Sequence, residues 1–399
     1  MKLAGFVAAL AASVTFSSAQ AEEGVEADRI VFAQVAALEG PAADLGLRMK
    51  TGIEAAFAQV NQNGGIFGRQ LVLEAFDDHY EPDMSVEQVQ AVLDDGNYLA
   101  LIGPVGTPTT LVTQPLATEA RMPFVGPFTG AGFLRDASHG NIINFRASYD
   151  AETEEWIRYL VDTKGMSNIA ILYQNDGFGK VGLAGVEKAL ERRGMTLSAA
   201  DTYERNTTDI RQALDTIKAV NPEAVVMVGA YAPISEFIKT ARSEGVDATY
   251  VTISFVGSMS LLRDLGEDGE GVIVSQVVPF PLNGAIPVIG EYQRALMGAG
   301  KADELDFVSL EGYLVGKMAI EALWVAGGDL NRENYLAALN SMRTVDLGGI
   351  VLQFGEGDNQ GSDEVYMTRI SAEGTFEDLW AFEAANNGGG ASNESYDEY

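Results

Sequence analysis

The sequence contains no cysteine and only two histidines, His79 and His139. Without cysteine the chain can form neither a disulfide nor a thiolate metal site, and it has no thiol nucleophile. Two histidines also leave little basis for a zinc site or for several acid–base residues. We therefore predict no metal ion, and we expect both histidines to lie in surface turns.

Basic residues are scarce as well. Against 57 Asp and Glu residues there are 26 Lys and Arg, so the formal net charge is −31. Nucleic acids and anionic lipid surfaces are bound by clusters of Lys and Arg. We therefore expect neither as a partner, and we expect the protein to be a soluble monomer.

Long hydrophobic runs are also missing, because no later segment reaches the roughly 18 continuous apolar residues of a membrane span. At the N-terminus, Lys2 precedes a short apolar stretch, residues 3–16, and the small-residue site Ala19-Gln20-Ala21. This pattern is typical of a secretory signal peptide. We expect residues 1–21 to be removed, and the mature chain to begin at Glu22 in the periplasm.

The chain does contain a regular alternation of two patterns. Short apolar runs rich in β-branched residues are typical of strands buried on both faces of a parallel sheet, and segments with helical periodicity lie between them. This alternation predicts an α/β protein with two doubly wound parallel-sheet lobes. The expected strands are 30–35, 71–76, 99–102, 124–125, 169–173, 224–228 and 250–253, and the expected helices are 47–61, 85–94, 151–163, 181–193, 209–219, 235–243 and 310–326.

No linker rich in Pro, Gly or Ser divides the chain. Instead, three extended stretches are expected to cross between the lobes and form a multi-stranded hinge: residues 142–148, 274–281 and 347–354. The first lobe is then expected to comprise residues 28–147 with 280–347, and the second residues 148–279 with 348–384. The tail, residues 385–399, has no apolar periodicity and is expected to be disordered.

One segment has the spacing of a dinucleotide-binding turn, Gly177-Phe178-Gly179-Lys180-Val181-Gly182. Three polar residues separate it from the preceding strand, and Asp176 would place a negative charge beside a pyrophosphate. A glycine-permitted turn into a helix is therefore favoured, and no cofactor is predicted.

Other catalytic or metal-binding patterns are equally weak. There is no GxSxG nucleophile elbow. The acidic stretch, residues 77–83, lacks the spacing of a calcium loop, and Pro82 before a helical run fits a turn and cap better. These observations favour a binding protein over an exported hydrolase or dehydrogenase.

Polar and aromatic residues follow several of the predicted strands, at the edge where open α/β sheets hold ligands. In the first of these loops, Thr107 can cap a helix that begins at Pro108, and the free amides there would suit a ligand carboxylate. Capping alone explains Thr107 equally well. The loops in question are 105–107, 128–130, 229–233 and 254–257.

Several local motifs along the chain, taken together, indicate a resemblance to a known family. They are Leu38-Glu39-Gly40-Pro41 with Gly46 and Gly52, Asn61-Gln62-Asn63-Gly64-Gly65-Ile66-Phe67-Gly68-Arg69, Asp77-Asp78, Ile102-Gly103-Pro104, Phe145-Arg146 with Asp150, and Gly312-Tyr313. The chain resembles the periplasmic branched-chain amino-acid-binding (Leu/Ile/Val-binding) family, the type I solute-binding proteins of ABC transporters. The resemblance covers nearly the whole mature chain.

This resemblance implies that two lobes close over a small ligand, which is then passed to a membrane permease. An exported sensor of the same fold is the alternative. It also implies that loops 105–107 and 128–130, Tyr231 and an acid in the next loop hold an amino acid, but Ser254 stands at the acid's position. Either another carboxylate pairs with the ammonium, or the ligand lacks an α-ammonium, which we favour because an unpaired buried charge is costly.

Aromatic residues near these loops suit an apolar or aromatic ligand body. The expected ligand is therefore a small organic acid with an apolar or aromatic body, with an amino acid as the alternative. Carboxylates that would pair with an ammonium are Glu39, Asp150, Asp176 and Glu311. The candidate ligand-binding residues are Leu45, Val105, Gly106, Thr107, Phe128, Thr129, Gly130, Asp150, Phe178, Tyr231, Ser254, Phe255 and Glu311.

Overall fold

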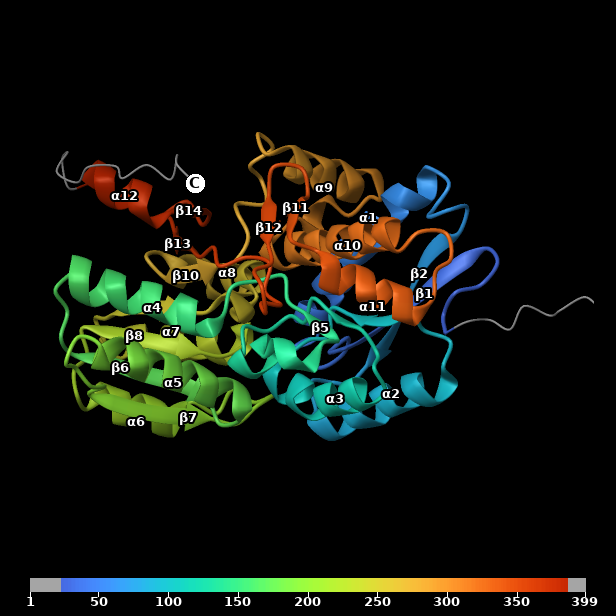
Figure 1. Cartoon of the computed structure of the whole chain (residues 1–399). Coiled ribbons are helices and arrows are strands. Elements are labelled where there is room, and N and C mark those ends of the chain that lie inside the picture. Colours follow the sequence, from blue (N-terminus) through green and yellow to red (C-terminus); the bar gives the residue numbers. More distant parts are fainter. Residues whose placement is uncertain (1–22, 387–399) are drawn as a thin grey trace, which may run out of the picture.

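The computed structural model describes residues 23–386 and contains two α/β lobes that lie side by side (Figure 1). The first lobe is built on a five-stranded sheet in the order β2-β1-β3-β4-β5, in which all neighbouring strands are parallel. Its strands are β1 (Arg29–Ala36), β2 (Gln70–Asp77), β3 (Ala100–Ile102), β4 (Phe124–Val125) and β5 (Ile142–Ile143).

The second lobe is built on a seven-stranded sheet in the order β14-β13-β10-β9-β8-β6-β7. Strands β6 to β10 are parallel to their neighbours, whereas β13 and β14 add to one edge in antiparallel fashion. The predicted fold class is confirmed, with this antiparallel edge as the departure. The strands are β6 (Ile169–Gln174), β7 (Ala199–Tyr203), β8 (Ala224–Val228), β9 (Thr249–Thr252), β10 (Ile273–Gln276), β13 (Tyr366–Ile370) and β14 (Phe376–Asp378).

The helices pack on both faces of these sheets, and none in the described part of the chain is long and apolar enough to span a membrane. In the first lobe they are α1 (Ala43–Gln62), α2 (Pro82–Asp95), α3 (Thr107–Glu119), α9 (Pro287–Gly298), α10 (Phe307–Ala326) and α11 (Arg332–Ser341). In the second they are α4 (Tyr149–Ile157), α5 (Gly177–Glu191), α6 (Arg211–Lys218), α7 (Tyr231–Ser243), α8 (Ser258–Leu265) and α12 (Leu379–Asn386).

Strand β1 carries a mostly apolar run that is buried on both faces, and its buried Gln34 donates to the carbonyl of Gly103 at 3.0 Å. Ile30 and Phe32 belong to the core formed with α1 and α10, whereas Val31, Ala33 and Val35 pack in a second core with α2 and α3. Alternate side chains of a strand point to opposite faces, so both faces of this sheet are buried. A mostly apolar run is therefore the expected pattern for β1.

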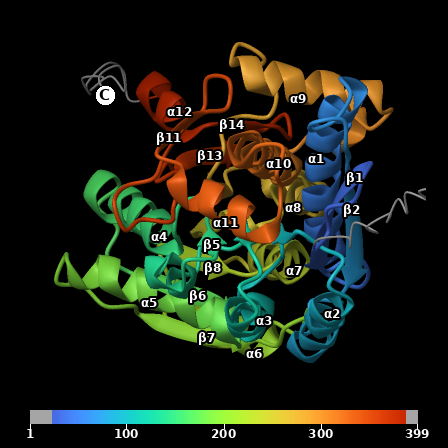
Figure 2. The ribbon, with the colours of Figure 1, turned by 45° about the vertical axis from the view of Figure 1, so that its right-hand side comes forward.

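Helix α10 lies directly against α1, although it is far away in the sequence. In Figure 2 the orange helices α9, α10 and α11 lie among the blue and cyan elements of the first lobe. A Cβ added to Gly52 would lie 2.0 Å from the carbonyl oxygen of Ser309, and one added to Gly312 would lie 2.3 Å from that of Met49. These two motif glycines therefore permit a close helix–helix approach.

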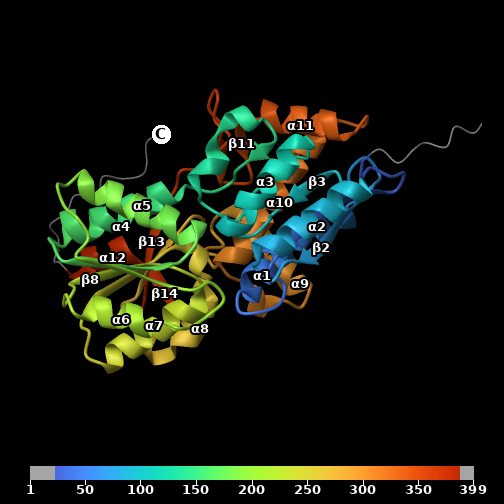
Figure 3. The same ribbon diagram turned by 90° about the horizontal axis from the view of Figure 1, so that it is seen from below.

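Three connections join the lobes, and the view from below separates the two halves (Figure 3). The first two, 144–148 and 277–286, overlap the predicted stretches. The third runs from 354 to 365, later than the predicted 347–354, where β11 (Thr344–Asp346) and β12 (Val351–Gln353) form a hairpin instead. Asp346 closes that hairpin by accepting hydrogen bonds from the amides of Gly348 and Gly349.

The first and third connections lie side by side. The amide of Asn144 donates to the carbonyl of Asn359 at 2.7 Å, and the amide of Gly361 donates to the carbonyl of Asn144 at 2.9 Å. The lobe ranges expected from the sequence stay a prediction. The predicted signal peptide and most of the predicted tail lie outside the described residues. Residues 385 and 386 were expected to belong to the disordered tail, but they form the end of helix α12.

Candidate functional site

The two loops that follow β3 and β4 meet as expected, but Thr107 does not cap a helix. Gly106 is the N-cap of α3, with φ of 105°, and Thr107 is the first helical residue. The Thr107 hydroxyl instead lies 2.6 Å from the Thr129 hydroxyl, and Val105 pairs with Phe128. The next residue, Gly130, accepts a hydrogen bond from the Tyr149 amide at 2.8 Å.

Five aromatic rings from both lobes form a cluster between the strand ends, here called the aromatic cluster: Tyr80, Phe128, Tyr149, Phe178 and Phe255. Each is at most 1 % exposed. The ring centroid of Phe255 lies 5.2 Å from that of Phe128, 4.7 Å from that of Phe178 and 6.0 Å from that of Tyr80. The predicted rings Phe128, Phe178 and Phe255 are thus brought together, and they place an apolar surface at the interface between the lobes.

The predicted residues Leu45 and Tyr231 meet beside Gly257. A Cβ added to Gly257 would lie 2.8 Å from Leu45 and 3.2 Å from the Tyr231 ring. Tyr231 was expected in a loop, but it is the first residue of α7. The sequence around it contains Gly229 and Pro233, which are typical of turns, yet Pro is also tolerated in the first turn of a helix.

Ser254 is buried and is tied to a carboxylate that comes from α4. Its hydroxyl donates to Glu152 Oε1 at 2.9 Å and its amide donates to Glu152 Oε2 at 3.0 Å. Glu152 Oε2 also accepts from the Ser275 hydroxyl at 2.5 Å. An acid, Glu152, therefore lies next to Ser254, but its two oxygens already accept hydrogen bonds from these donors.

The guanidinium of Arg146 lies at the centre of this buried group. Its Nη2 donates to Glu152 Oε1 at 3.2 Å and also to the Ser254 hydroxyl. The guanidinium stacks over the Phe128 ring, 5.1 Å from its centroid, and lies 5.7 Å from the Tyr149 centroid. Arg146 thus connects the polar group to the aromatic cluster, partly through cation–π contacts.

Glu311 approaches Arg146 from α10. Its Oε2 lies 3.7 Å from Arg146 Nη1, and its side chain is 3 % exposed. The pKa of the Glu311 carboxyl is raised to about 7: burial and the nearby Glu152 raise it, and they outweigh Arg146 and Arg135, which lower it. Glu311 is therefore buried next to a cation, and its carboxyl changes protonation state near neutral pH.

Asp150 and Asp176 do not reach this group. The Asp150 side chain is 53 % exposed and pairs with Lys188 at 2.7 Å, so the structure places it outside the buried group around Arg146. Its position on the outer face of α4 explains this, because Glu152 occupies the inner face. Asp176 is the N-cap of α5 and accepts from the amides of Phe178 and Gly179, which accounts for the GxGxxG spacing as a helix start.

The acidic turn after β2 brings Glu39, Asp77 and His79 together, with their ligand atoms within 4.8 Å of one another. Asp77 Oδ1 accepts hydrogen bonds from the amides of Leu38, Glu39 and His79. His79 Nε2 lies 3.0 Å from Asp77 Oδ2. These bonds give Asp77 a structural role in the turn, and Glu39 is exposed there, away from the Ser254 loop.

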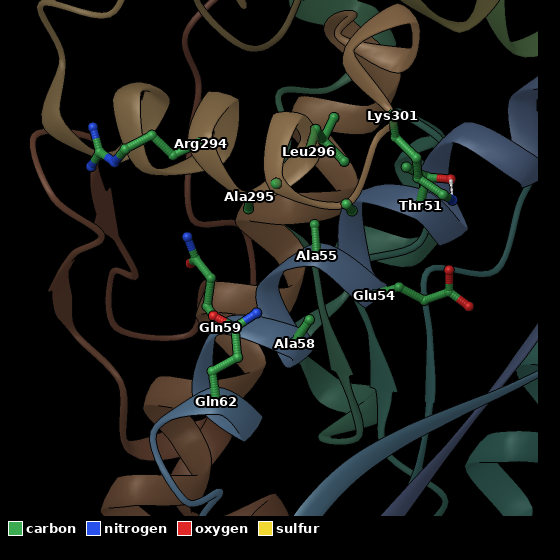
Figure 4. A pocket seen from close by; sticks show the side chains of 12 residues that line it. Thr51, Glu54, Ala55, Ala58, Gln59, Gln62, Arg294, Ala295, Leu296 and Lys301 are labelled. Atoms are coloured by element: carbon green, nitrogen blue, oxygen red, sulfur yellow. Dashed lines mark hydrogen bonds between the residues drawn. The ribbon is translucent and has the colours of Figure 1, made fainter.

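A separate groove of about 370 Å³ lies on the first lobe, between α1 and α9. Figure 4 shows Glu54, Gln59 and Gln62 of α1 facing Arg294 and Leu296 of α9 across it. None of the predicted site residues lines this groove. It is therefore distinct from the group of side chains at the lobe interface.

Hydrogen bonds across the lobes hold the structure closed at two rims. At one rim, Arg205 Nη2 lies 2.6 Å from Glu81 Oε2 of the first lobe, while its Nη1 lies 3.0 Å from Asp176 Oδ2 within the second lobe. At the other, Asp44 on α1 accepts from the Ser260 hydroxyl at 2.6 Å and from Arg263 at 2.9 Å. The second-lobe residues of both rims therefore bind acids of the first lobe.

Replacing Arg205 by alanine should shift the lobes toward an open arrangement. The variant loses a half-exposed ion pair to Glu81, which contributes about 1 kcal/mol, so the ratio of closed to open forms should fall roughly fivefold. Small-angle X-ray scattering should then give a larger radius of gyration. Arg211→Ala is the matched control, because Arg211 pairs with Glu244 inside the second lobe. Equal radii for both variants would contradict a role of Arg205 in closure.

Sequence reasoning missed five residues of the interface: Tyr80, Arg146, Tyr149, Glu152 and Ser275. Arg146 was noticed only as part of a motif. Glu152 had a usable signal, because Tyr149, Glu152 and Trp156 follow the spacing of one helix face and all three are fully buried. A glutamate at such a position requires a buried partner.

Comparisons with known proteins agree on one family. The model for the periplasmic binding protein family matches residues 29–375. The Leu/Ile/Val/Thr-binding protein of Salmonella typhimurium is 24% identical over 250 residues, which cover 63% of this chain and 68% of that protein.

Two solved structures with the same fold are also of proteins named as binding proteins. A possible leucine/isoleucine/valine-binding protein from Rhodopirellula baltica is 34% identical, with a TM-score of 0.83 and coverage of 90% of this chain and 98% of that one. A fatty acid ABC transporter substrate-binding protein from Thermomonospora curvata shares the fold at 20% identity, with a TM-score of 0.82 and coverage of 90% and 93%. This chain therefore belongs to the periplasmic binding protein family, and its resemblance to the branched-chain amino-acid-binding members is confirmed.

Proposed function

We propose that the protein captures a small carboxylate-bearing solute between its lobes outside the cytoplasm and delivers it to the permease of an ABC transporter. One observation carries this proposal. The aromatic cluster and the buried Arg146 lie between the lobes, at the carboxyl ends of the strands, where open α/β sheets bind ligands. Hinge closure then buries the ligand without chemical change.

Several findings support a binding role over catalysis. The family is described as binding proteins, and relatives such as the Leu/Ile/Val/Thr-binding protein of Salmonella typhimurium are named for the solutes they bind. At the lobe interface, Glu152 is occupied by Arg146, Ser254 and Ser275, which suits a fixed scaffold more than a proton-transfer group. His139 lies in a short 3-10 turn, residues 137–139, and the His79 ring pairs with Asp77 in the turn after β2, where only the His79 carbonyl bonds to the second lobe, through Asn206.

The ligand's identity does not follow from the fold, because proteins of this fold carry names with different solutes. A carboxylate is favoured by the cation Arg146 and by the hydroxyls of Thr107 and Thr129. The aromatic cluster favours an apolar or aromatic body. We further propose that residues 1–21 direct export to the periplasm and that the protein acts there as a monomer without nucleic acid.

A thermal-shift screen of residues 22–399 tests this function. The compounds are α-amino acids, aliphatic and aromatic carboxylates, amides and polyols. A ligand present at 100 times its Kd stabilises the folded protein by about 2.7 kcal/mol, which should raise Tm by about 5 °C. We expect the response among carboxylate-bearing compounds. A flat profile across the whole screen would contradict the proposed function.

A further inference from the structure

At the lobe interface, Arg146 and Glu311 carry three buried polar atoms without a hydrogen-bond partner within residues 23–386, namely Arg146 Nε, Arg146 Nη1 and Glu311 Oε1, and the Tyr149 hydroxyl is a fourth such atom. The side chains of Arg146 and Glu311 are at most 3 % exposed. Buried polar groups in folded proteins are nearly always hydrogen-bonded, and each exception calls for an explanation. Here three of the exceptions belong to a cation and an acid that face each other at 3.7 Å.

The nitrogen atoms of the Arg146 guanidinium differ in their hydrogen bonding. Nη2 is held by Glu152 and Ser254, so the guanidinium is fixed in place. Nε and Nη1 make no hydrogen bond, although Nη1 lies 3.7 Å from Glu311 Oε2, and the guanidinium carbon lies 5.1 Å from the centroid of the Phe128 ring. A fixed guanidinium with two free donors next to an apolar ring is suited to a carboxylate attached to an apolar body.

The charges around this place decide which ligand fits. Arg146 and Arg135 are positive and Glu152 is negative, so the group has one excess positive charge when Glu311 is protonated and none when it is ionised. Charges on the neighbouring helices are paired elsewhere: Arg48 of α1 with Asp306, and Arg263 of α8 with Asp44. A ligand anion therefore fits the protonated form of Glu311 better.

We propose that Arg146 anchors the carboxylate of a solute that carries no ammonium group, and that Glu311 takes up a proton when this solute binds. The inference rests on the proposed function and names its ligand class. Glu311 on the first lobe then acts as a specificity residue. When ionised it repels a second carboxylate, and when protonated it can donate a hydrogen bond to one.

Burial and neighbouring charge place the pKa of Glu311 at about 7, so the exchange of this proton falls within an accessible range. Above that pH, the fraction of free protein in which Glu311 is protonated falls about tenfold with each pH unit. The affinity for a carboxylate should therefore fall about tenfold per pH unit. A zwitterionic amino acid, whose ammonium would pair with ionised Glu311, should show the opposite tendency or none.

Isothermal titration calorimetry tests the inference with two matched pairs of probes. 3-Phenylpropanoate is compared with L-phenylalanine, and 4-methylpentanoate with L-leucine, because each pair differs only in the α-ammonium. Titrations in phosphate and in Tris at pH 8 report the number of protons taken up. We expect binding of a carboxylate probe with uptake of close to one proton, and Kd rising about tenfold from pH 8 to pH 9.

Two variants separate Glu311 from general effects of pH. Glu311→Gln should abolish the proton uptake and make Kd independent of pH, since an amide does not ionise. Glu321→Gln is the control on the same helix, where Glu321 is only half-buried, and it should behave as the wild type. The buffer comparison on the wild type gives an answer even if Glu311→Gln does not fold.

Three results would overturn the inference. These are carboxylate binding without proton uptake, binding of the amino acids but not their carboxylate partners, and no binding by any of the four probes. In each case the proposed function is judged separately by the broader thermal-shift screen. It survives if any carboxylate-bearing compound there raises Tm, and it fails together with the inference if none does.

Discussion

Replacing Glu152 by alanine should lower the free energy of unfolding by about 3 to 5 kcal/mol. The carboxylate is fully buried and accepts from Arg146, from the Ser254 amide and hydroxyl, and from the Ser275 hydroxyl. Its removal leaves a buried guanidinium without its hydrogen-bonded counter-ion, and it leaves three neutral donors unpaired. Because these partners join α4, β10 and the loop after β9, the loss affects the second lobe and its contact with the hinge.

Chemical denaturation in urea at pH 7 measures this change. Glu155→Ala is the matched control: Glu155 lies on the same helix, pairs with Arg158 one turn away, and is partly exposed. The control should cost no more than about 1 kcal/mol. A loss below about 1 kcal/mol for Glu152→Ala would show that the buried network contributes little to the native state.

The second large effect is a loss of stability with rising pH that depends on Glu311. Its pKa is about 7 in the folded protein against an ordinary value of 4.5, so the folded state binds more protons than the unfolded state between these values. Stability contributed by the protonated group is therefore lost as pH rises from about 4.5, and the loss is complete above about 7. The size of the shift corresponds to about 3 kcal/mol.

Glu311→Gln removes this dependence. Urea denaturation at pH 5, 6, 7 and 8 should show the variant gaining stability relative to the wild type with each step up to about pH 7, and no further gain above it. Asp78, whose pKa burial raises to about 6, contributes equally to both proteins and cancels in the comparison. Parallel pH profiles would contradict the assignment of a buried, titrating Glu311.

Patterns local in the sequence predicted most of the sheets and helices. The run at residues 30–35 identifies β1 because both faces of the sheet are covered, and the glycines at 52 and 312 belong to motifs whose structural reason is the close contact of α1 with α10. Errors arose where one local signal has two meanings. Gly229 and Pro233 suggested a loop at Tyr231, and an extended stretch near residue 350 suggested a crossing where a hairpin lies.

The polar centre of the site was less predictable for a physical reason. Glu152 is joined to Ser254 and Ser275, which are more than 100 residues away in the chain. No spacing rule relates such residues, since they are brought together only when α4 packs against the ends of β9 and β10. The substitution of serine at the expected acid position was visible, but the acid that compensates for it was not. Asp150 was chosen instead, two residues away on the opposite face of the helix.

The most direct test of ligand capture between the lobes is a crystal structure of the protein with a compound that raises its Tm. We expect the compound to lie between the lobes, with its carboxylate on Arg146 and its apolar part against Phe128 and Phe255. Contacts from both lobes are required by closure around the ligand. A compound bound in the groove between α1 and α9, or touching one lobe alone, would contradict the account.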